Sequence, residues 1–206
     1  MIAQPSKIVC VGRNYVDHAR ELGNEVPKAP LLFLKPPSAL IGNGEAIVLP
    51  AASARVEFES EIGVVIGRRL SHAGSDEAAA AIHGFVCLND VTARDLQKSD
   101  GQWTRAKGFD TFCPAGPAVV TGLDWRALEV VGRVNGVERQ RGRASEMVFS
   151  IPVLLSYISG VMTLMPGDLI ATGTPAGVGP LAPGDVVEVE IPGVGILRNP
   201  VTGPGQ

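Results

Sequence analysis

The pattern of apolar and polar positions is most informative over residues 55–67, Arg-Val-Glu-Phe-Glu-Ser-Glu-Ile-Gly-Val-Val-Ile-Gly. The second half is almost wholly apolar and β-branched, which predicts a strand buried on both faces. The first half alternates, and because successive side chains of a strand point to opposite faces, Glu57, Glu59 and Glu61 should share one face. Carboxylates roughly 6.5–7 Å apart repel one another unless solvent or a cation separates them. The pattern therefore favours either a divalent cation held by two of these glutamates or a solvated edge strand.

The remaining pattern predicts a strand-rich fold with a few short helices. Asn135-Gly136 between two apolar runs is typical of a two-residue hairpin turn, and Ser75 and Ser150 are expected to cap helices. The predicted strands are residues 7–12, 31–34, 46–49, 55–67, 84–88, 117–121, 128–134, 169–171, 186–191 and 196–201, and the predicted helices are residues 15–22, 75–81, 92–98 and 150–159. We expect loops at residues 25–30 and 99–113, and one mainly β (α+β) domain over residues 1–206, folded as a sandwich or rolled sheet.

Composition and charge argue against several classes of function. The chain has 206 residues, a formal net charge of −3 and no basic run, which disfavours nucleic acid as a partner. No apolar segment approaches the roughly 20 residues of a membrane helix, and the first apolar run is too brief for a signal peptide. Cys10, Cys87 and Cys113 are odd in number and form no Cys-x-x-Cys pair, so we expect reduced, packed thiols in a cytoplasmic protein.

Asp90 is a candidate third acidic ligand. It follows the apolar strand predicted at residues 84–88, where side chains commonly reach a site at the rim of a sheet. A set of oxygen ligands alone favours magnesium or manganese over zinc. The alternative is an Asx turn or a helix N-cap in front of Val91-Thr92.

His18 and Glu21 are a candidate general-base pair. They lie three residues apart on a predicted helix and should therefore share a face. A carboxylate that orients an imidazole can help it to deprotonate a water. The same spacing also occurs on many surface helices that have no catalytic role.

Two loops carry further candidate groups. Lys107 lies in the long segment 99–113, where it could stabilise an enolate or bind a carboxylate, or simply face solvent. The glycine-rich residues 172–179 could offer backbone N–H groups to an anion. They lack the Gly-Lys-Ser/Thr ending of a nucleotide P-loop, which excludes ATP or GTP binding of that kind.

A series of ordered motifs covers nearly the whole chain. They are Val-Gly-Arg-Asn-Tyr at 11–15, His-Ala-Arg-Glu at 18–21, Phe-Leu-Lys-Pro-Pro-Ser-Ala-Leu at 33–40, Glu-Ser-Glu at 59–61, Asn-Asp-Val-Thr-Ala-Arg-Asp-Leu-Gln at 89–97, Lys-Gly-Phe-Asp-Thr-Phe at 107–112, and the run from Pro-Gly-Asp to Gly-Val-Gly at 166–179. Together they resemble the fumarylacetoacetate hydrolase family. The likeness is greatest to its compact single-domain members, the acylpyruvase and oxaloacetate decarboxylase group.

The resemblance implies a mixed β-sandwich roll, a homodimer and one Mg²⁺ or Mn²⁺ ion per subunit. The implied metal ligands are Glu59, Glu61 and Asp90, while Glu57 falls at a position that is acidic but not ligating. His18 and Glu21 match the pair that activates water, on a segment (13–30) that closes as a lid in relatives. Lys107 matches a lysine that contacts substrate. Arg13, Phe33, Gln97 and Thr174 match positions that line the substrate site.

The resemblance also implies an activity on small 2-oxo acids. The first expectation is metal-dependent hydrolysis of a carbon–carbon bond in an acylpyruvate, of the acetylpyruvate or fumarylpyruvate class, with release of pyruvate. Oxaloacetate decarboxylation and the isomerisation or decarboxylation of 2-hydroxyhepta-2,4-diene-1,7-dioate in aromatic catabolism remain open. A non-catalytic protein that binds metal or small carboxylates is the alternative from another class.

Overall fold

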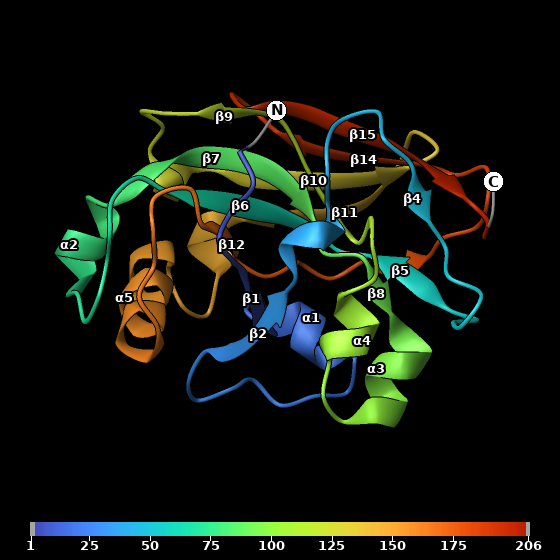
Figure 1. The fold of residues 1–206 in the computed structure, drawn as a ribbon, viewed down its shortest axis with the longest axis horizontal. Helices are drawn as coiled ribbons and strands as arrows, with labels where there is room; N and C mark the ends of the chain where they lie inside the picture. The colour runs from blue at the N-terminus through green and yellow to red at the C-terminus, as the bar shows by residue number, and fades with distance from the viewer. Residues whose placement is uncertain (1–2, 205–206) are drawn as a thin grey trace.

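The computed structural model describes residues 3–204, which form packed β-sheets with helices beside them (Figure 1). A seven-stranded sheet has the order β2-β1-β12-β6-β7-β9-β3, and a five-stranded sheet has the order β11-β10-β14-β15-β4. A small third sheet has the order β13-β5-β8. This arrangement confirms the predicted mainly β sandwich roll.

The elements have the following bounds. The strands of the seven-stranded sheet are β1 Ile8–Gly12, β2 Leu31–Lys35, β3 Leu40–Ile41, β6 Ser60–Ile66, β7 Ile82–Asn89, β9 Cys113–Val120 and β12 Leu169–Ala171. The others are β4 Ile47–Val48, β5 Val56–Phe58, β8 Thr92–Ala93, β10 Glu129–Val134, β11 Val137–Arg143, β13 Gly179–Pro180, β14 Val186–Ile191 and β15 Gly195–Thr202. The helices are α1 Val16–Glu21, α2 Ser75–Ala79, α3 Arg94–Asp100, α4 Thr104–Lys107 and α5 Ile151–Val161.

Strand β6 is buried along its whole length, with an apolar cluster on each of its two faces. Ile62, Val64 and Ile66 pack in a core shared with α5 and with the five-stranded sheet. Val65 points the other way, into a second apolar cluster with residues of β1, β7, β9 and β12. The continuous apolar run predicted a strand buried on both faces, and the structure confirms this.

The segment predicted as one strand over residues 55–67 divides at Glu59, which corrects the sequence prediction. Strand β5 pairs with β8 and β13 in the small sheet, whereas β6 pairs with β7 and β12 in the large one. At the junction the Glu59 N–H donates to the side-chain oxygen of Asn89, at 2.9 Å. Glu57 lies outside the group formed by Glu59, Glu61 and Asp90, and its buried carboxylate binds Arg55 and Arg94, the second of which also binds Glu59.

Local signals elsewhere are confirmed in some places and corrected in others. Asn135 and Gly136 join β10 to β11 with φ values of 54° and 75°, as the predicted hairpin turn requires. Gly74, not Ser75, holds the N-cap position of α2, and Ser150 precedes α5 without a side-chain capping bond. The segment 99–113 is not wholly irregular, because α4 forms within it. No helix among residues 3–204 has both the length and the apolar character that a membrane crossing requires.

All three thiols are buried and free, and we expect them to resist modification in the folded protein. Burial raises the pKa of Cys87 and of Cys113 to about 12, and burial followed by the charge of Asp90 raises the pKa of Cys10. Since the thiolate is the reactive form, an aromatic disulfide reagent at pH 8 should label none of them within minutes. The same reagent should label all three in guanidinium. Rapid labelling of the native protein would contradict this packing.

Candidate metal centre and active site

Three buried carboxylates meet where the large and small sheets join. Glu59, Glu61 and Asp90 each offer an oxygen, and these oxygens lie within 4.8 Å of one another. The register of β6 against β7 pairs Ser60 with Asn89, so the next residue, Asp90, lies beside Glu59. The Asp90 N–H donates to the Glu59 carbonyl at 2.8 Å, which fixes that approach. The candidate ligands are therefore brought together by strand pairing.

Three cationic side chains neutralise two of these carboxylates. The Lys107 ammonium donates to Glu59 at 2.8 Å and to Asp90 at 2.6 Å. Arg94 donates to the other oxygen of Glu59 at 2.7 Å, and the Lys35 ammonium forms a buried ion pair with Asp90. Burial would raise the pKa of Glu59, but Lys107 and Arg94 outweigh burial and hold that pKa well below its usual range. Glu59 is thus ionised in the folded protein.

Glu61 lacks such compensation within residues 3–204. The partner of its carboxylate there is the backbone N–H of Gly173, at 2.7 Å. Burial, followed by the charges of Asp90 and Glu59, raises the pKa of Glu61 well above its ordinary value. A buried carboxylate of this kind is costly unless a cation neutralises it. With its all-oxygen donors, the group fits a hard divalent ion such as Mg²⁺ or Mn²⁺.

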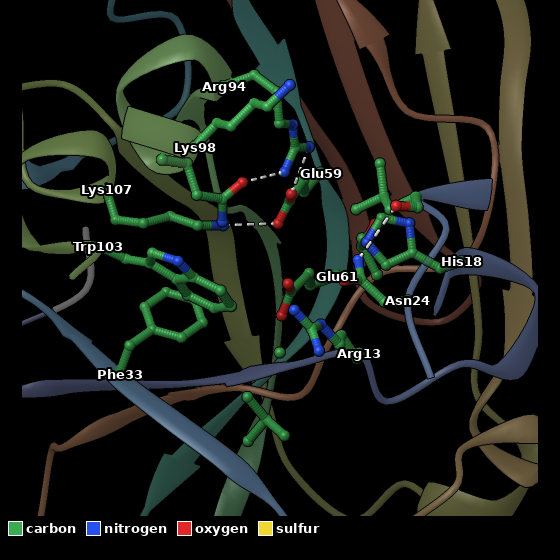
Figure 2. Close-up of a pocket in the computed structure, with 15 residues that line it drawn as sticks. Arg13, His18, Asn24, Phe33, Glu59, Glu61, Arg94, Lys98, Trp103 and Lys107 are labelled. Carbon is green, nitrogen blue, oxygen red and sulfur yellow. Dashed lines mark hydrogen bonds and ion pairs between the residues drawn. The ribbon is translucent and has the colours of Figure 1, made fainter. Parts of the chain in front are cut away.

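A cavity of about 440 Å³ opens over the carboxylates (Figure 2). It brings together most of the residues that the sequence singled out. Those that line it are Arg13, His18, Phe33, Glu59, Glu61, Gln97, Lys107 and Thr174. Asp90 and Glu21 lie behind this lining, where Asp90 pairs with the two lysines and Glu21 contacts His18.

Helix α1 places His18 at the cavity and places Glu21 beside the imidazole ring of His18. The His18 Nδ1 lies 3.2 Å from a carboxylate oxygen of Glu21. The second oxygen of Glu21 accepts a hydrogen bond from the Gly177 N–H at 3.0 Å, which ties the helix to the glycine-rich loop. Because the carboxylate favours a proton on Nδ1, the Nε2 of the neutral ring is the nitrogen that is free to accept one. The pair thus has the arrangement of a general base.

The sequence reasoning missed several residues of the cavity. Trp103 stands edge-on to Phe33, with ring centroids 5.2 Å apart, and Lys107 lies 4.8 Å from the Phe33 centroid. Lys98 and Arg94 add positive charge to the lining, and Lys35 adds charge beneath it. The isolated Trp103 in a long polar segment was one available signal. Lys35 and Arg94 lie inside motifs of the family resemblance that implied no role for them, and Lys98 lies just after such a motif.

Comparison with known proteins identifies relatives along nearly the whole chain. Residues 7–202 match the family described as fumarylacetoacetate (FAA) hydrolase C-terminal. An uncharacterized protein of Methanocaldococcus jannaschii is 53% identical over 196 residues, which span 95% of this chain and 83% of that protein. A mitochondrial oxaloacetate tautomerase of Homo sapiens is 42% identical over 212 residues, which span 97% of this chain and 68% of that protein.

Solved structures agree with this relationship. A 2-hydroxyhepta-2,4-diene-1,7-dioate isomerase from Mycobacterium marinum superposes with a TM-score of 0.91 at 49% identity, covering 98% of this chain and 77% of that one. A 5-carboxymethyl-2-hydroxymuconate delta-isomerase from Mycobacterium smegmatis superposes with a TM-score of 0.92 at 48% identity, covering 98% of this chain and 81% of that one. The family match and these relatives agree over the same residues, and the chain belongs to the fumarylacetoacetate hydrolase family of enzymes.

Proposed function

We propose that this protein catalyses keto–enol tautomerisation of a small 2-oxo diacid of the oxaloacetate class, with Mg²⁺ or Mn²⁺ as cofactor. One observation carries the proposal. The His18–Glu21 pair and the group of Glu59, Glu61 and Asp90 lie at the same cavity. A base and a site for a hard cation are the two requirements for moving a proton next to a 2-oxo group.

The metal would be held by Glu59, Glu61 and Asp90. When bound, it supplies a Lewis acid that polarises the 2-oxo group and so acidifies the neighbouring carbon. The Lys107 ammonium, placed between Glu59 and Asp90, adds a fixed positive charge close to the oxygen where negative charge develops. Burial of this ammonium keeps water from screening its charge.

In the keto-to-enol direction His18 takes a proton from the carbon next to the 2-oxo group, and the enolate oxygen gains a proton to give the enol; in the reverse direction the protonated His18 returns the proton to that carbon. Its Nε2 accepts the proton, and Glu21 at Nδ1 stabilises the imidazolium that forms. Arg13 and Lys98, which also line the cavity, would offer cationic partners to the second carboxylate of a diacid. The Phe33–Trp103 wall would exclude water from the reacting carbon.

The names of the relatives support a proton shift as the reaction. One relative is called an oxaloacetate tautomerase, and two structural neighbours are called isomerases. The test is to add the enol form of oxaloacetate and to follow its loss by ultraviolet absorbance, with the spontaneous rate subtracted. Turnover that requires Mg²⁺ or Mn²⁺ and stops with a chelator is expected. A rate equal to the spontaneous one would overturn the proposal.

Acylpyruvate hydrolysis is the second candidate, and one observation favours it. The same His18–Glu21 pair could deprotonate a water that attacks the distal carbonyl of an acylpyruvate. Release of pyruvate from acetylpyruvate, measured with the same metals, would show this activity. Oxaloacetate decarboxylation would release pyruvate and carbon dioxide without an attacking water. A non-catalytic binder would bind metal and diacid without turning over any of these substrates.

His18→Ala should lower the tautomerisation rate by about 100-fold or more, because the proton acceptor is lost. The Mn²⁺ affinity should remain unchanged, since His18 is not among the proposed ligands. Any hydrolysis should fall similarly, and any decarboxylation much less. His83→Ala, at an exposed position on β7, is the matched control and should keep full activity. Equal losses in hydrolysis and decarboxylation would contradict the role of His18 as the base.

A further inference from the structure

Ser60 separates the two glutamates of the proposed metal site, and side chains hold its backbone. Its N–H donates to the side-chain oxygen of Gln140 at 2.9 Å, and its carbonyl accepts from the Thr174 hydroxyl at 2.9 Å. Gln140 belongs to β11 of the five-stranded sheet, eighty positions away along the chain. The spacing between Glu59 and Glu61 therefore depends on a residue from another layer of the fold.

Both hydrogen atoms of the Gln140 amide are also used in hydrogen bonds. Its Nε2 donates to the Thr174 hydroxyl and to the Pro175 carbonyl, both at 2.7 Å. Because the Ser60 N–H needs an oxygen partner, the amide has one orientation that satisfies every bond. Gln140 is almost completely buried, so water cannot replace these bonds without a rearrangement. It joins the segment that carries two proposed ligands to the loop that carries Thr174.

The backbone around Gln140 is shaped for this approach. The register of β10 against β11 shifts between the pairs Gly132–Gln140 and Arg133–Glu138, so Arg139 is the extra residue of a β-bulge. Bulges re-aim the side chains next to them. A Cβ at Gly132 would collide with the Ser60 hydroxyl, and one at Gly177, where φ is +103°, would collide with the Arg139 carbonyl. Both contacts need glycine and allow the layers to meet closely.

We propose that Gln140 is a positioning residue for the metal site. It touches neither the cavity nor the three carboxylates, but it fixes the backbone between Glu59 and Glu61 and the hydroxyl of Thr174. Gly177, packed on the same bulge, donates to Glu21, so the bulge supports both halves of the site. This inference rests on the proposed function, because it concerns the geometry of the ion that this function requires.

The test compares Gln140→Met with a variant that loses a similar buried amide elsewhere. Asn199 of β15 donates two hydrogen bonds to the carbonyls of Gly42 and Glu45, both at 2.8 Å, and lies outside the cavity. Gln140→Met and Asn199→Leu should both lower the melting temperature. Only Gln140→Met should weaken Mn²⁺ binding, measured by calorimetry without substrate, by about tenfold or more. Equal Mn²⁺ affinity in the two variants would overturn the proposal.

Thr174 gives a second test that does not depend on the folding of Gln140→Met. Thr174→Val removes the hydroxyl that joins Gln140 to Ser60 and should weaken Mn²⁺ binding similarly, whereas Thr174→Ser retains the hydroxyl and should restore it. Unchanged binding in Thr174→Val would overturn the inference. If the unaltered protein binds Mn²⁺ normally in that case, the proposed function stands. If the unaltered protein binds no Mn²⁺, both are overturned.

Discussion

Glu61→Gln should remove metal binding while making the metal-free protein more stable. Glutamine preserves the shape and the acceptor for the Gly173 N–H, but it removes the carboxylate charge that repels Glu59 and Asp90. Loss of a charged ligand should weaken Mn²⁺ binding by at least about 100-fold, beyond what supporting residues typically contribute. Lewis-acid stabilisation worth several kcal/mol would be lost with it, which corresponds to a fall in rate of about 1,000-fold or more.

The opposite signs of these two effects make the measurement decisive. Calorimetric Mn²⁺ titration and thermal melting in chelator should show weaker binding together with a higher melting temperature, which a misfolded variant would not show. Glu57→Gln is the matched control, since Glu57 is equally buried on the same segment but faces Arg55 and Arg94. It should change Mn²⁺ affinity by less than tenfold. Normal binding by Glu61→Gln would exclude Glu61 as a ligand.

The parts of the fold that the sequence predicted are those decided by local chemistry. The Asn135-Gly136 turn needs positive φ at both residues, and these residue types adopt it readily. The apolar run of β6 predicted burial on both faces without knowledge of what covers them. Helix α4, by contrast, lies in a segment without an apolar repeat, and it packs against α3 and β2. Tertiary contacts outweigh local propensity there.

The break of the glutamate segment at Glu59 could not be predicted for a related reason. An alternating pattern specifies which side chains share a face only while the strand continues. Here Asn89 and Gln140 replace backbone partners at Glu59 and Ser60, and both come from distant parts of the chain. The alternation nevertheless selected Glu59 and Glu61, because these two remain on the same side across the junction and meet at one group.

The cations of the site were predicted only in part, and the reason is physical. The role of Lys107 follows from the family resemblance, whereas Lys35 and Arg94 lie inside the motifs of that resemblance without a role implied for either. Their importance arises from burial beside carboxylates that lie 35 to 55 positions away. Gln140 belongs to the same class, as a polar residue on a strand otherwise rich in exposed charges. Long-range polar contacts of this kind have no periodic signature.

Lys107→Met should lower the rate of catalysis without weakening metal binding, whereas Glu61→Gln should weaken metal binding itself. The buried ammonium of Lys107 compensates Glu59 and Asp90, and its removal leaves their charges partly unpaired. Breaking a buried pair in this way typically costs about 3–5 kcal/mol. For a domain of this size, that corresponds to a fall in melting temperature of roughly 10 °C in chelator. Mn²⁺ should restore most of the loss, because the ion supplies the missing positive charge, and its affinity should equal or exceed that of the unaltered protein.

The rate should nevertheless fall by about 100- to 1,000-fold, since the fixed charge that faces the developing enolate is gone. Lys35→Met is the matched control, because Lys35 compensates Asp90 from beneath and does not line the cavity. It should lower the metal-free melting temperature similarly but reduce kcat much less. Melting curves with and without Mn²⁺, together with kcat at saturating metal, separate the two lysines. An equal loss of kcat in both variants would mean that Lys107 acts through the charge balance of the carboxylates and not through the substrate.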